Sequence, residues 1–482
     1  MPAVTTKGYR AWNLLKKAAT RPVDIILDND SNGLFSGLGY DSGFVTAMLA
    51  LFGSTSMYAD TLRAFREAVD TPATNGTGGG GQSVGYGVAG DKALTFRSGG
   101  GGQASKDVAG NAVLAAFWNS RLDPGAASSP NNCNHLGESW WNSTSDPVAN
   151  PAKQNGITMN ANQPLGAGNV AGQQLQYQLW RARFSAADGG GSNVADIWWL
   201  ENGSATNQFN GLSMSNTTTD VPLTPLTLDL PITGRASNSN FEIRRQSPAA
   251  NSSTAYPFAA FFQRVLKKTQ ATGFAVSPFY SVGGAKATDV VAYMQAMTVA
   301  RICNYLKALM YQQTALGFEP MAVIFSMFGI NEHGGSVSKA TYKAAVEAEF
   351  NLWRQVWATC GYKPQNLAFV ACPGHPKVTA DGGMTGYREA AAELASEGID
   401  VSAIDYSKLA TYEELHQGAT IPRYFNSGND TAHLEVVTTD NNSYNPMASR
   451  LLAALRDSPT DGLLGASGSR FAASRFRQSR AA

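Results

Sequence analysis

The sequence predicts an α/β fold in which a parallel β-sheet has helices on both faces and carries a large β-rich insertion. Near the N-terminus, a short apolar strand at 23–28 stops abruptly in Asp, Asn and Ser residues. From Tyr256 onward, helical and strand-like segments alternate, which is typical of a parallel sheet covered by helices. Between these parts, segments such as 175–184 and 225–230 alternate apolar and polar residues, which indicates antiparallel strands.

The N-terminal part begins with a polar arm, residues 1–22, in which we expect a short helix over 12–19. The apolar strand at 23–28 follows the arm. The next element is expected to be a packed helix over 43–53, because its apolar residues recur at helical spacing.

Two segments make up the predicted insertion. Residues 75–165 are rich in Gly, Ser and Asn and are expected to be loop-rich. Residues 166–255 are expected to form an inserted β-sandwich-like domain, because turn residues bound each alternating run. Trp180, Trp198 and Trp199 lie on its predicted strands, where tryptophans either pack into a core or stack on sugar rings.

The C-terminal part completes an α/β domain that is discontinuous and covers 23–74 and 256–460. Asp289 and Ser338 are available as helix N-caps, and Gly361 follows the end of the second helix. The helices are expected over 289–316, 338–360, 385–396 and 445–455, and the strands over 273–280, 321–330, 365–372 and 401–405.

Residues 461–482 form a basic C-terminal tail, rich in arginine and with little apolar pattern. Two interpretations stay open for it. It is either a solvated, disordered tail or a segment held by a partner. The second interpretation favours a homo-oligomer or a subunit of a larger assembly.

Composition excludes several classes of function. The chain has 482 residues, of which 43% are hydrophobic, and a net charge of +1. No basic excess indicates a nucleic-acid partner, and no long apolar run indicates a membrane span. The N-terminus lacks an apolar signal region, so we expect synthesis in a cytoplasm without a signal peptide. The four cysteines lack Cys-x-x-Cys spacing, which favours buried free thiols over disulfides or zinc.

Polar residues that can perform acyl transfer stand where predicted strands end and near the C-terminus. Ser31 follows the strand at 23–28, and Asn331 follows the strand at 321–330. Asp430 precedes His433 by three positions, so its carboxylate can accept the Nδ1–H and leave Nε2 free to take a proton from a serine. An Asn side chain at a strand end can direct its amide at a developing oxyanion.

These segments resemble, in the same order, the four motif blocks of the SGNH (GDSL-type) hydrolase superfamily. The Gly-Asp-Ser block corresponds to 29–31, the glycine block to 281–285, the Gly-x-Asn-Asp block to 329–332 and the Asp-x-x-His block to 430–433. The chain departs from the family pattern at two positions, where Asn29 replaces a glycine and Glu332 replaces an aspartate. The glycine block also lies much farther from the serine than is usual, which agrees with a large insertion.

The resemblance implies a three-layer α/β sandwich with a parallel, flavodoxin-like sheet and a serine esterase activity. In that reading Ser31 is the nucleophile, His433 the base and Asp430 the residue that orients the base. The backbone N–H groups of Ser31 and Gly284 and the amide of Asn331 would form the oxyanion hole.

Asn32 and His333 adjoin these residues and are expected to line the substrate site. No histidine pair has the spacing of metal ligands, so we expect neither a metal nor a cofactor.

The expected substrate is a short acyl ester, above all an O-acetyl group on a polysaccharide, because the insertion looks like a sugar-binding sandwich. The layout also resembles SGNH proteins carried on phage particles, which suggests a location on a virion tail or capsid surface. The alternative is a non-catalytic structural or glycan-binding subunit that uses the same fold.

Overall fold

The computed structural model describes about half of the chain, with gaps. The described residues are 4–6, 10–30, 32, 40–54, 56–59, 63–64, 94–96, 105–106, 112–113, 118–121, 138–141, 156–160, 175–181, 194–201, 204–213, 226–230, 240–245, 256–258, 261–267, 269–281, 285–297, 299–374, 384–410 and 444–458.

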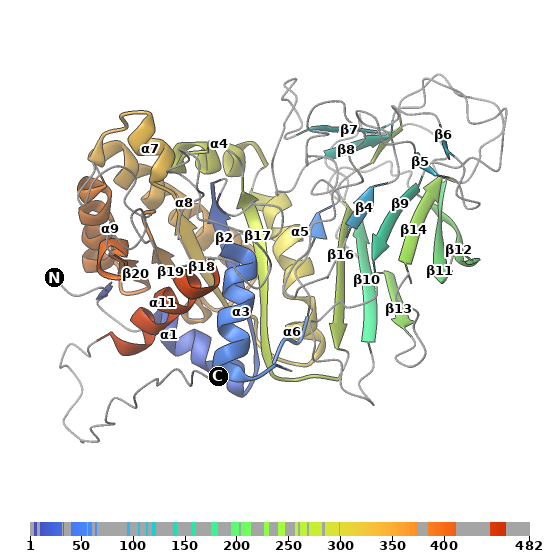
Figure 1. Cartoon of the computed structure of the whole chain (residues 1–482), viewed down its shortest axis with the longest axis horizontal. Helices are drawn as coiled ribbons and strands as arrows, with labels where there is room; N and C mark the ends of the chain where they lie inside the picture. The colour runs from blue at the N-terminus through green and yellow to red at the C-terminus, as the bar shows by residue number, and fades with distance from the viewer. Residues whose placement is uncertain are drawn as a thin grey trace, which may run out of the picture.

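A six-stranded sheet in the order β1-β20-β19-β18-β2-β17 forms the centre of the α/β part (Figure 1). Every neighbouring pair is parallel except β1 and β20, which are antiparallel. The strands are β1 Val4–Thr6, β2 Pro22–Asn29, β17 Gly273–Ser281, β18 Ala322–Met327, β19 Leu367–Ala371 and β20 Val401–Ile404. The α/β class is thus confirmed, and the sheet is mixed where a parallel one was expected. The N-terminal arm adds an antiparallel edge strand, because its Val4 is buried against the sheet.

Helices cover both faces of this sheet, which makes three layers. On one face lie α1 (Arg10–Leu15), the 3₁₀ turn η1 (Lys16–Ala19), α3 (Tyr40–Phe52) and α11 (Tyr444–Asp457), seen together in Figure 1. On the other face lie α4 (Ala287–Met297), α5 (Val299–Leu309), α8 (Lys339–Thr359) and α9 (Thr385–Glu397), whose apolar sides share one core with the strands. The short elements α6 (Tyr311–Ala315), α7 (Ile330–Gly334), η7 (Pro364–Asn366) and η8 (Tyr406–Lys408) connect them.

The long helix α8 begins and ends where the sequence predicts. Ser338 is its N-cap, and the Ser338 hydroxyl oxygen accepts a hydrogen bond from the Thr341 backbone N–H at 3.1 Å. Gly361 follows its C-cap with a φ of +80°, a conformation that glycine adopts without strain. By contrast, the single helix expected over 289–316 is wrong, because the chain there forms α4, α5 and α6. The break lets both α4 and α5 pack on α8.

The remaining described strands pair antiparallel, as predicted for the insertion. Strands β3, β15 and β16 belong with them although they lie outside its predicted bounds, 75–255, because they pair with other antiparallel strands and not with the six-stranded sheet. They include sheets in the orders β13-β10-β16-β3 and β12-β11-β14-β9-β4, which stand beyond β17 in Figure 1. Their boundaries as one separate sandwich domain stay a prediction. The strands are β3 Arg63–Ala64, β4 Leu94–Phe96, β5 Ser105–Lys106, β6 Ala112–Val113, β7 Trp118–Arg121, β8 Glu138–Trp141, β9 Gly156–Asn160, β10 Leu175–Arg181, β11 Val194–Glu201, β12 Ser204–Ser213, β13 Leu226–Leu230, β14 Asn240–Arg245, β15 Tyr256–Phe258 and β16 Phe261–Lys267.

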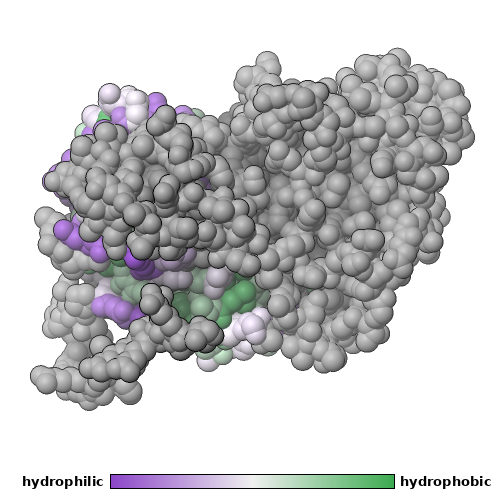
Figure 2. Space-filling model, viewed as in Figure 1, coloured by the Kyte–Doolittle hydropathy of each residue, from purple (hydrophilic) through white to green (hydrophobic). Residues whose placement is uncertain are grey.

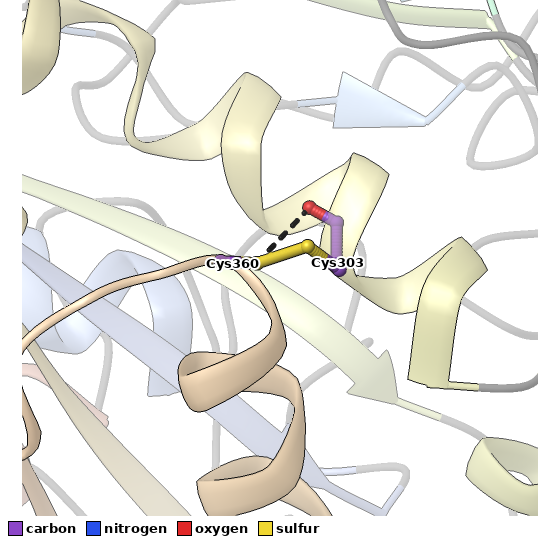
Figure 3. The surroundings of a disulfide bond; sticks show 2 residues. All are labelled: Cys303 and Cys360. Carbon is purple, nitrogen blue, oxygen red and sulfur yellow. Dashed lines mark hydrogen bonds between the residues drawn. A yellow bond between two sulfur atoms is a disulfide. The ribbon is translucent and has the colours of Figure 1, made fainter.

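Two cysteines are joined, contrary to the expectation of free thiols. Cys303 on α5 and Cys360 at the end of α8 form a disulfide with a Cα–Cα distance of 5.6 Å (Figure 3). The spacing in the sequence gave no sign of it, because the packing of α5 on α8 brings the two residues together. Cys372 is a buried free thiol, and burial raises its pKa.

Among the described residues, the large hydrophobic side chains that are exposed are Leu51 and Ile399. Figure 2 shows a hydrophobic area over the C-terminal part of α3, where Leu51 is 38% exposed. Among the helices that the structure describes, none is both long and apolar enough to cross a membrane. The basic tail, 461–482, lies outside the described residues.

Candidate functional site

Three of the four motif blocks follow neighbouring strands of the sheet. The order β18-β2-β17 places the carboxyl ends of these parallel strands side by side. Strand β2 leads into 29–31, β17 into 281–285 and β18 into 329–332. In open α/β sheets, ligands bind at this edge. The topology therefore brings together blocks that are far apart in the sequence.

The Asp30 carboxylate holds the turn after β2. Asp30 is 1% exposed, and its Oδ1 accepts hydrogen bonds from the backbone N–H of Asn32 at 2.9 Å and from the Asn32 side-chain amide at 2.8 Å. The Asp30 backbone N–H in turn donates to Asn29 Oδ1 at 2.8 Å. Such local side-chain bonds favour a turn over a continued strand. The residues on both sides of position 31 are thus fixed by one carboxylate, and Asn29 contributes to the turn at the position where the SGNH pattern has glycine.

The side-chain amide of Asn331 joins the three blocks. Its Nδ2 donates to the Ala285 carbonyl oxygen at 2.9 Å and to Asp30 Oδ2 at 3.3 Å. Because both partners accept hydrogen bonds, they fix which side of the amide carries the nitrogen. The hydrogen bond to Asp30 is longer than the one to Ala285. The N–H that donates to Asp30 is therefore the one that could donate to a stronger acceptor instead.

A glycine allows the turn that carries Asn331. Gly329 is the N-cap of α7 and has a φ of +142°, which a residue with a side chain rarely adopts. A Cβ at this position would lie 3.0 Å from Met384 Cε and 3.2 Å from the Gly374 backbone nitrogen. The close packing of these loops therefore requires glycine at 329.

Glu332 ties α7 to the first residue of α4. It is 1% exposed, and its Oε1 accepts a hydrogen bond from the Ala287 backbone N–H. The pKa of Glu332 is raised to about 7, mainly by burial and in part by the nearby Asp30 carboxylate, while hydrogen bonds from backbone N–H groups offset part of the change. Glu332, at the position where the SGNH pattern has aspartate, therefore links the Asn331 block to the start of α4, two residues after the glycine block.

Four of the predicted site residues lie outside the described residues: Ser31, Gly284, Asp430 and His433. Their roles as nucleophile, oxyanion donor, orienting acid and base stay predictions. Asn331 is described, and its role as an oxyanion donor also stays a prediction.

Asn32 and His333 are both described. Asn32 is buried with its amide on Asp30, and His333 lies half-buried on α7. Their contact with substrate stays a prediction. Within the described ranges, no three side chains of His, Cys, Asp or Glu are grouped to hold a metal ion.

Two fully buried acids below the site, Asp28 and Glu349, were not singled out from the sequence. Asp28 lies in the apolar strand β2, and Glu349 lies on the same side of α8 as the buried Val346 and Trp353. The sequence did indicate them, because each is an acidic residue among apolar neighbours, Asp28 in a strand and Glu349 on the apolar side of a helix.

Comparison with known proteins gives no match to a protein-family model and none to a curated protein sequence. Among solved structures, the chain is similar to a peptidoglycan O-acetylesterase, with 11% identity, a TM-score of 0.45, and coverage of 94% of this chain and 98% of that one. It is also similar to a family two carbohydrate esterase from Clostridium thermocellum, with 12% identity, a TM-score of 0.24, and coverage of 63% and 92%. A xylan-binding module matches with 13% identity, a TM-score of 0.17, and coverage of 33% and 95%. All three TM-scores are low, so the site is assigned from its own geometry.

Proposed function

We propose that the protein is a serine ester hydrolase that works through an acyl-enzyme and removes O-acetyl or other short acyl groups from a polysaccharide. The observation that carries the proposal is the Asn331 amide, which bonds both to Asp30 and to the Ala285 carbonyl. Chance motifs scattered along a chain would not meet in this way, whereas three blocks of one active site must.

In the proposed reaction, Ser31 Oγ attacks the ester carbonyl carbon while His433 takes the hydroxyl proton. Asp430 orients His433 and stabilises its charged form. The oxyanion accepts hydrogen bonds from the backbone N–H groups of Ser31 and Gly284 and from the Asn331 amide. The C–O bond to the alcohol then breaks, and His433 returns the proton to the leaving oxygen. Water attacks the acyl-serine in the same manner and releases the acid.

The described geometry supports the part of Asn331 in this reaction. The oxyanion is an alkoxide, which is more basic than a carboxylate, so it competes with Asp30 for the N–H that reaches Asp30 at 3.3 Å. The bond to the Ala285 carbonyl, at 2.9 Å, meanwhile keeps the amide in place. A donor held before the reaction begins costs no reorganisation when the charge develops.

The antiparallel strands of the insertion support a polysaccharide as the acyl carrier. Trp180 lies on β10, and Trp198 and Trp199 lie on β11. Strand-borne tryptophans of this kind can stack on sugar rings. The virion location remains a separate prediction.

Hydrolysis of p-nitrophenyl acetate by the wild type and by Ser31→Ala tests the proposal. Ser42→Ala is a matched control, because Asp41 precedes Ser42 as Asp30 precedes Ser31. We expect activity in the wild type and in Ser42→Ala and none above background in Ser31→Ala. Acetate release from an acetylated polysaccharide should follow the same order. If Ser31→Ala is as active as the wild type, Ser31 is not the nucleophile and the proposal fails. If the wild type has no activity, the non-catalytic, glycan-binding alternative replaces the proposal.

A further inference from the structure

A pair of carboxyl groups lies in the core directly below the candidate site. Asp28, on β2, and Glu349, on α8, are both 0% exposed. Asp28 Oδ2 accepts a hydrogen bond from the Trp353 indole N–H at 2.8 Å, and Glu349 Oε2 accepts one from the Ser326 hydroxyl at 2.7 Å. The pair lies just before the Asp30 turn.

The sheet register brings the two carboxyl groups together, because Ser326, which binds Glu349, is paired with Asp28 between β18 and β2. One oxygen of each, Asp28 Oδ1 and Glu349 Oε1, is buried and has no hydrogen-bond partner among the described residues. An ionised carboxylate only accepts hydrogen bonds, so a bond between two carboxyl groups requires a proton on one of them. If both buried carboxyl groups were ionised, their negative charges would repel each other with little screening. The pair therefore holds a shared proton.

This pair contacts every strand that ends in a described motif block. Asp28 belongs to β2, and the Ser326 hydroxyl that binds Glu349 belongs to β18. Tyr280 of β17 is paired with Asp28 on the other side of β2, at the point where the register between β17 and β2 shifts. Three strands thus meet one pair of side chains just before their carboxyl ends.

We propose that Asp28 and Glu349 are a positioning pair whose shared proton holds the ends of β17, β2 and β18 in the arrangement that the active site needs. The consequence for turnover rests on the proposed esterase function, whereas the consequence for stability does not. When the shared proton is lost, two negative charges face each other in the core, and the strand ends separate from α8.

Other ionisable groups around the pair increase the free-energy cost of losing the shared proton. Glu332 on α7 and Asp28 both raise the pKa of Glu349 by repulsion. Tyr342 on α8 is fully buried beside Glu349, Glu332 and Cys372, and its pKa is raised, mainly by burial. Each of these groups, when ionised, adds negative charge around the pair.

The direction of the pH dependence follows from the raised pKa values. Burial raises the pKa of Asp28 to about 7 and that of Glu349 well above its usual range. In the unfolded chain both acids lose their protons near pH 4. The stability that the shared proton provides is therefore complete below about pH 4 and declines as pH rises through the raised pKa values.

Asp28→Asn tests the proposal, because an amide N–H can donate to Glu349 at every pH while the amide oxygen still accepts from Trp353. Asp24→Asn is the matched control. Asp24 is a buried acid at the other end of β2, bonded to Tyr58 and Gln313. The readouts are the Tm as a function of pH, kcat and KM for p-nitrophenyl acetate as functions of pH, and hydrogen exchange at the ends of β17, β2 and β18.

We expect the wild type and Asp24→Asn to lose Tm and kcat at alkaline pH, with faster exchange at those three strand ends. In Asp28→Asn, Tm and kcat should no longer fall at alkaline pH, and kcat at neutral pH should stay within about threefold of the wild-type value. Asp28→Ala should lower kcat about tenfold or more at a nearly constant KM, because the strand ends are no longer held.

An alkaline decline that is identical in Asp28→Asn and the wild type, in Tm and in exchange, would overturn the proposal. If the wild type has no esterase activity but the stability and exchange results are as expected, the positioning pair stands and the proposed function fails.

Discussion

Replacing Asn331 by alanine removes the amide that joins the three described motif blocks. Its Nδ2 donates to the Ala285 carbonyl at 2.9 Å and to Asp30 Oδ2 at 3.3 Å. A net hydrogen bond contributes about 1 kcal/mol, so the variant should lose roughly 2 kcal/mol of unfolding free energy. Loss of one oxyanion donor costs about 2.7–4 kcal/mol in the transition state, which corresponds to a roughly 10²–10³-fold lower kcat.

The assay is hydrolysis of p-nitrophenyl acetate at neutral pH by the purified protein, together with urea unfolding to measure stability. We expect kcat to fall by that factor while KM changes less than about threefold, because the oxyanion exists only in the transition state. The control is Asn366→Ala, which removes a buried amide that is 8% exposed. Asn366 lies next to the amino end of β19, whereas the candidate site lies at the carboxyl ends of the parallel strands. It should lose stability and keep its kcat.

One result would refute the reasoning about Asn331. If Asn331→Ala folds and keeps its kcat within about threefold of the wild type, the amide is not an oxyanion donor. A loss confined to stability would leave Asn331 with a purely structural role. A parallel loss of kcat in Asn366→Ala would show that the assay reports general destabilisation.

Three further predictions concern stability. Glu332→Gln should flatten part of the pH dependence of the unfolding free energy, which chemical denaturation across pH measures. The pKa of Glu332 is raised from 4.5 to about 7. The wild type therefore has a stabilisation of roughly 3 kcal/mol below pH 4.5 and loses it as pH rises through 7. Ser338→Ala should cost about 1 kcal/mol, because α8 loses its N-cap bond, and urea unfolding would detect it. Cys303→Ser should cost up to about 4 kcal/mol, because the disulfide with Cys360 closes a loop of 57 residues, and an equal Tm with and without reductant in the wild type would contradict this.

The sequence was sufficient for the parts of the fold that local chemistry decides. An apolar run that ends in polar residues predicted β2, and the Ser338 cap with Gly361 predicted both ends of α8. The motif blocks placed Asn331 in one predicted site with residues 29–31, and the structure brings Asn331 to Asp30 at the carboxyl ends of neighbouring parallel strands.

Features that depend on tertiary packing could not be predicted. The edge strand β1 pairs with β20 from the opposite end of the chain, and no local pattern encodes that contact. The disulfide between Cys303 and Cys360 depends on how α5 packs on α8. The pairing of Asp28 with Glu349 joins residues that are far apart in the sequence, although each acid on an apolar side was a visible anomaly.

The departures from the family pattern also gain a physical meaning. The Asn29 side chain accepts a hydrogen bond from the backbone of Asp30 within the turn. Glu332 reaches the backbone of Ala287 and so ties its motif block to the start of α4. Both substitutions therefore contribute hydrogen bonds that build the candidate site.

Covalent labelling tests directly whether Ser31 is the activated nucleophile of the protein. The full-length protein is treated with an alkyl fluorophosphonate, which reacts with activated serines, and the modified peptide is located by mass spectrometry. The account predicts one stoichiometric adduct on Ser31, lost in Ser31→Ala and in His433→Ala and retained in Ser42→Ala. An adduct on another residue, or no adduct on a protein that hydrolyses p-nitrophenyl acetate, would contradict it.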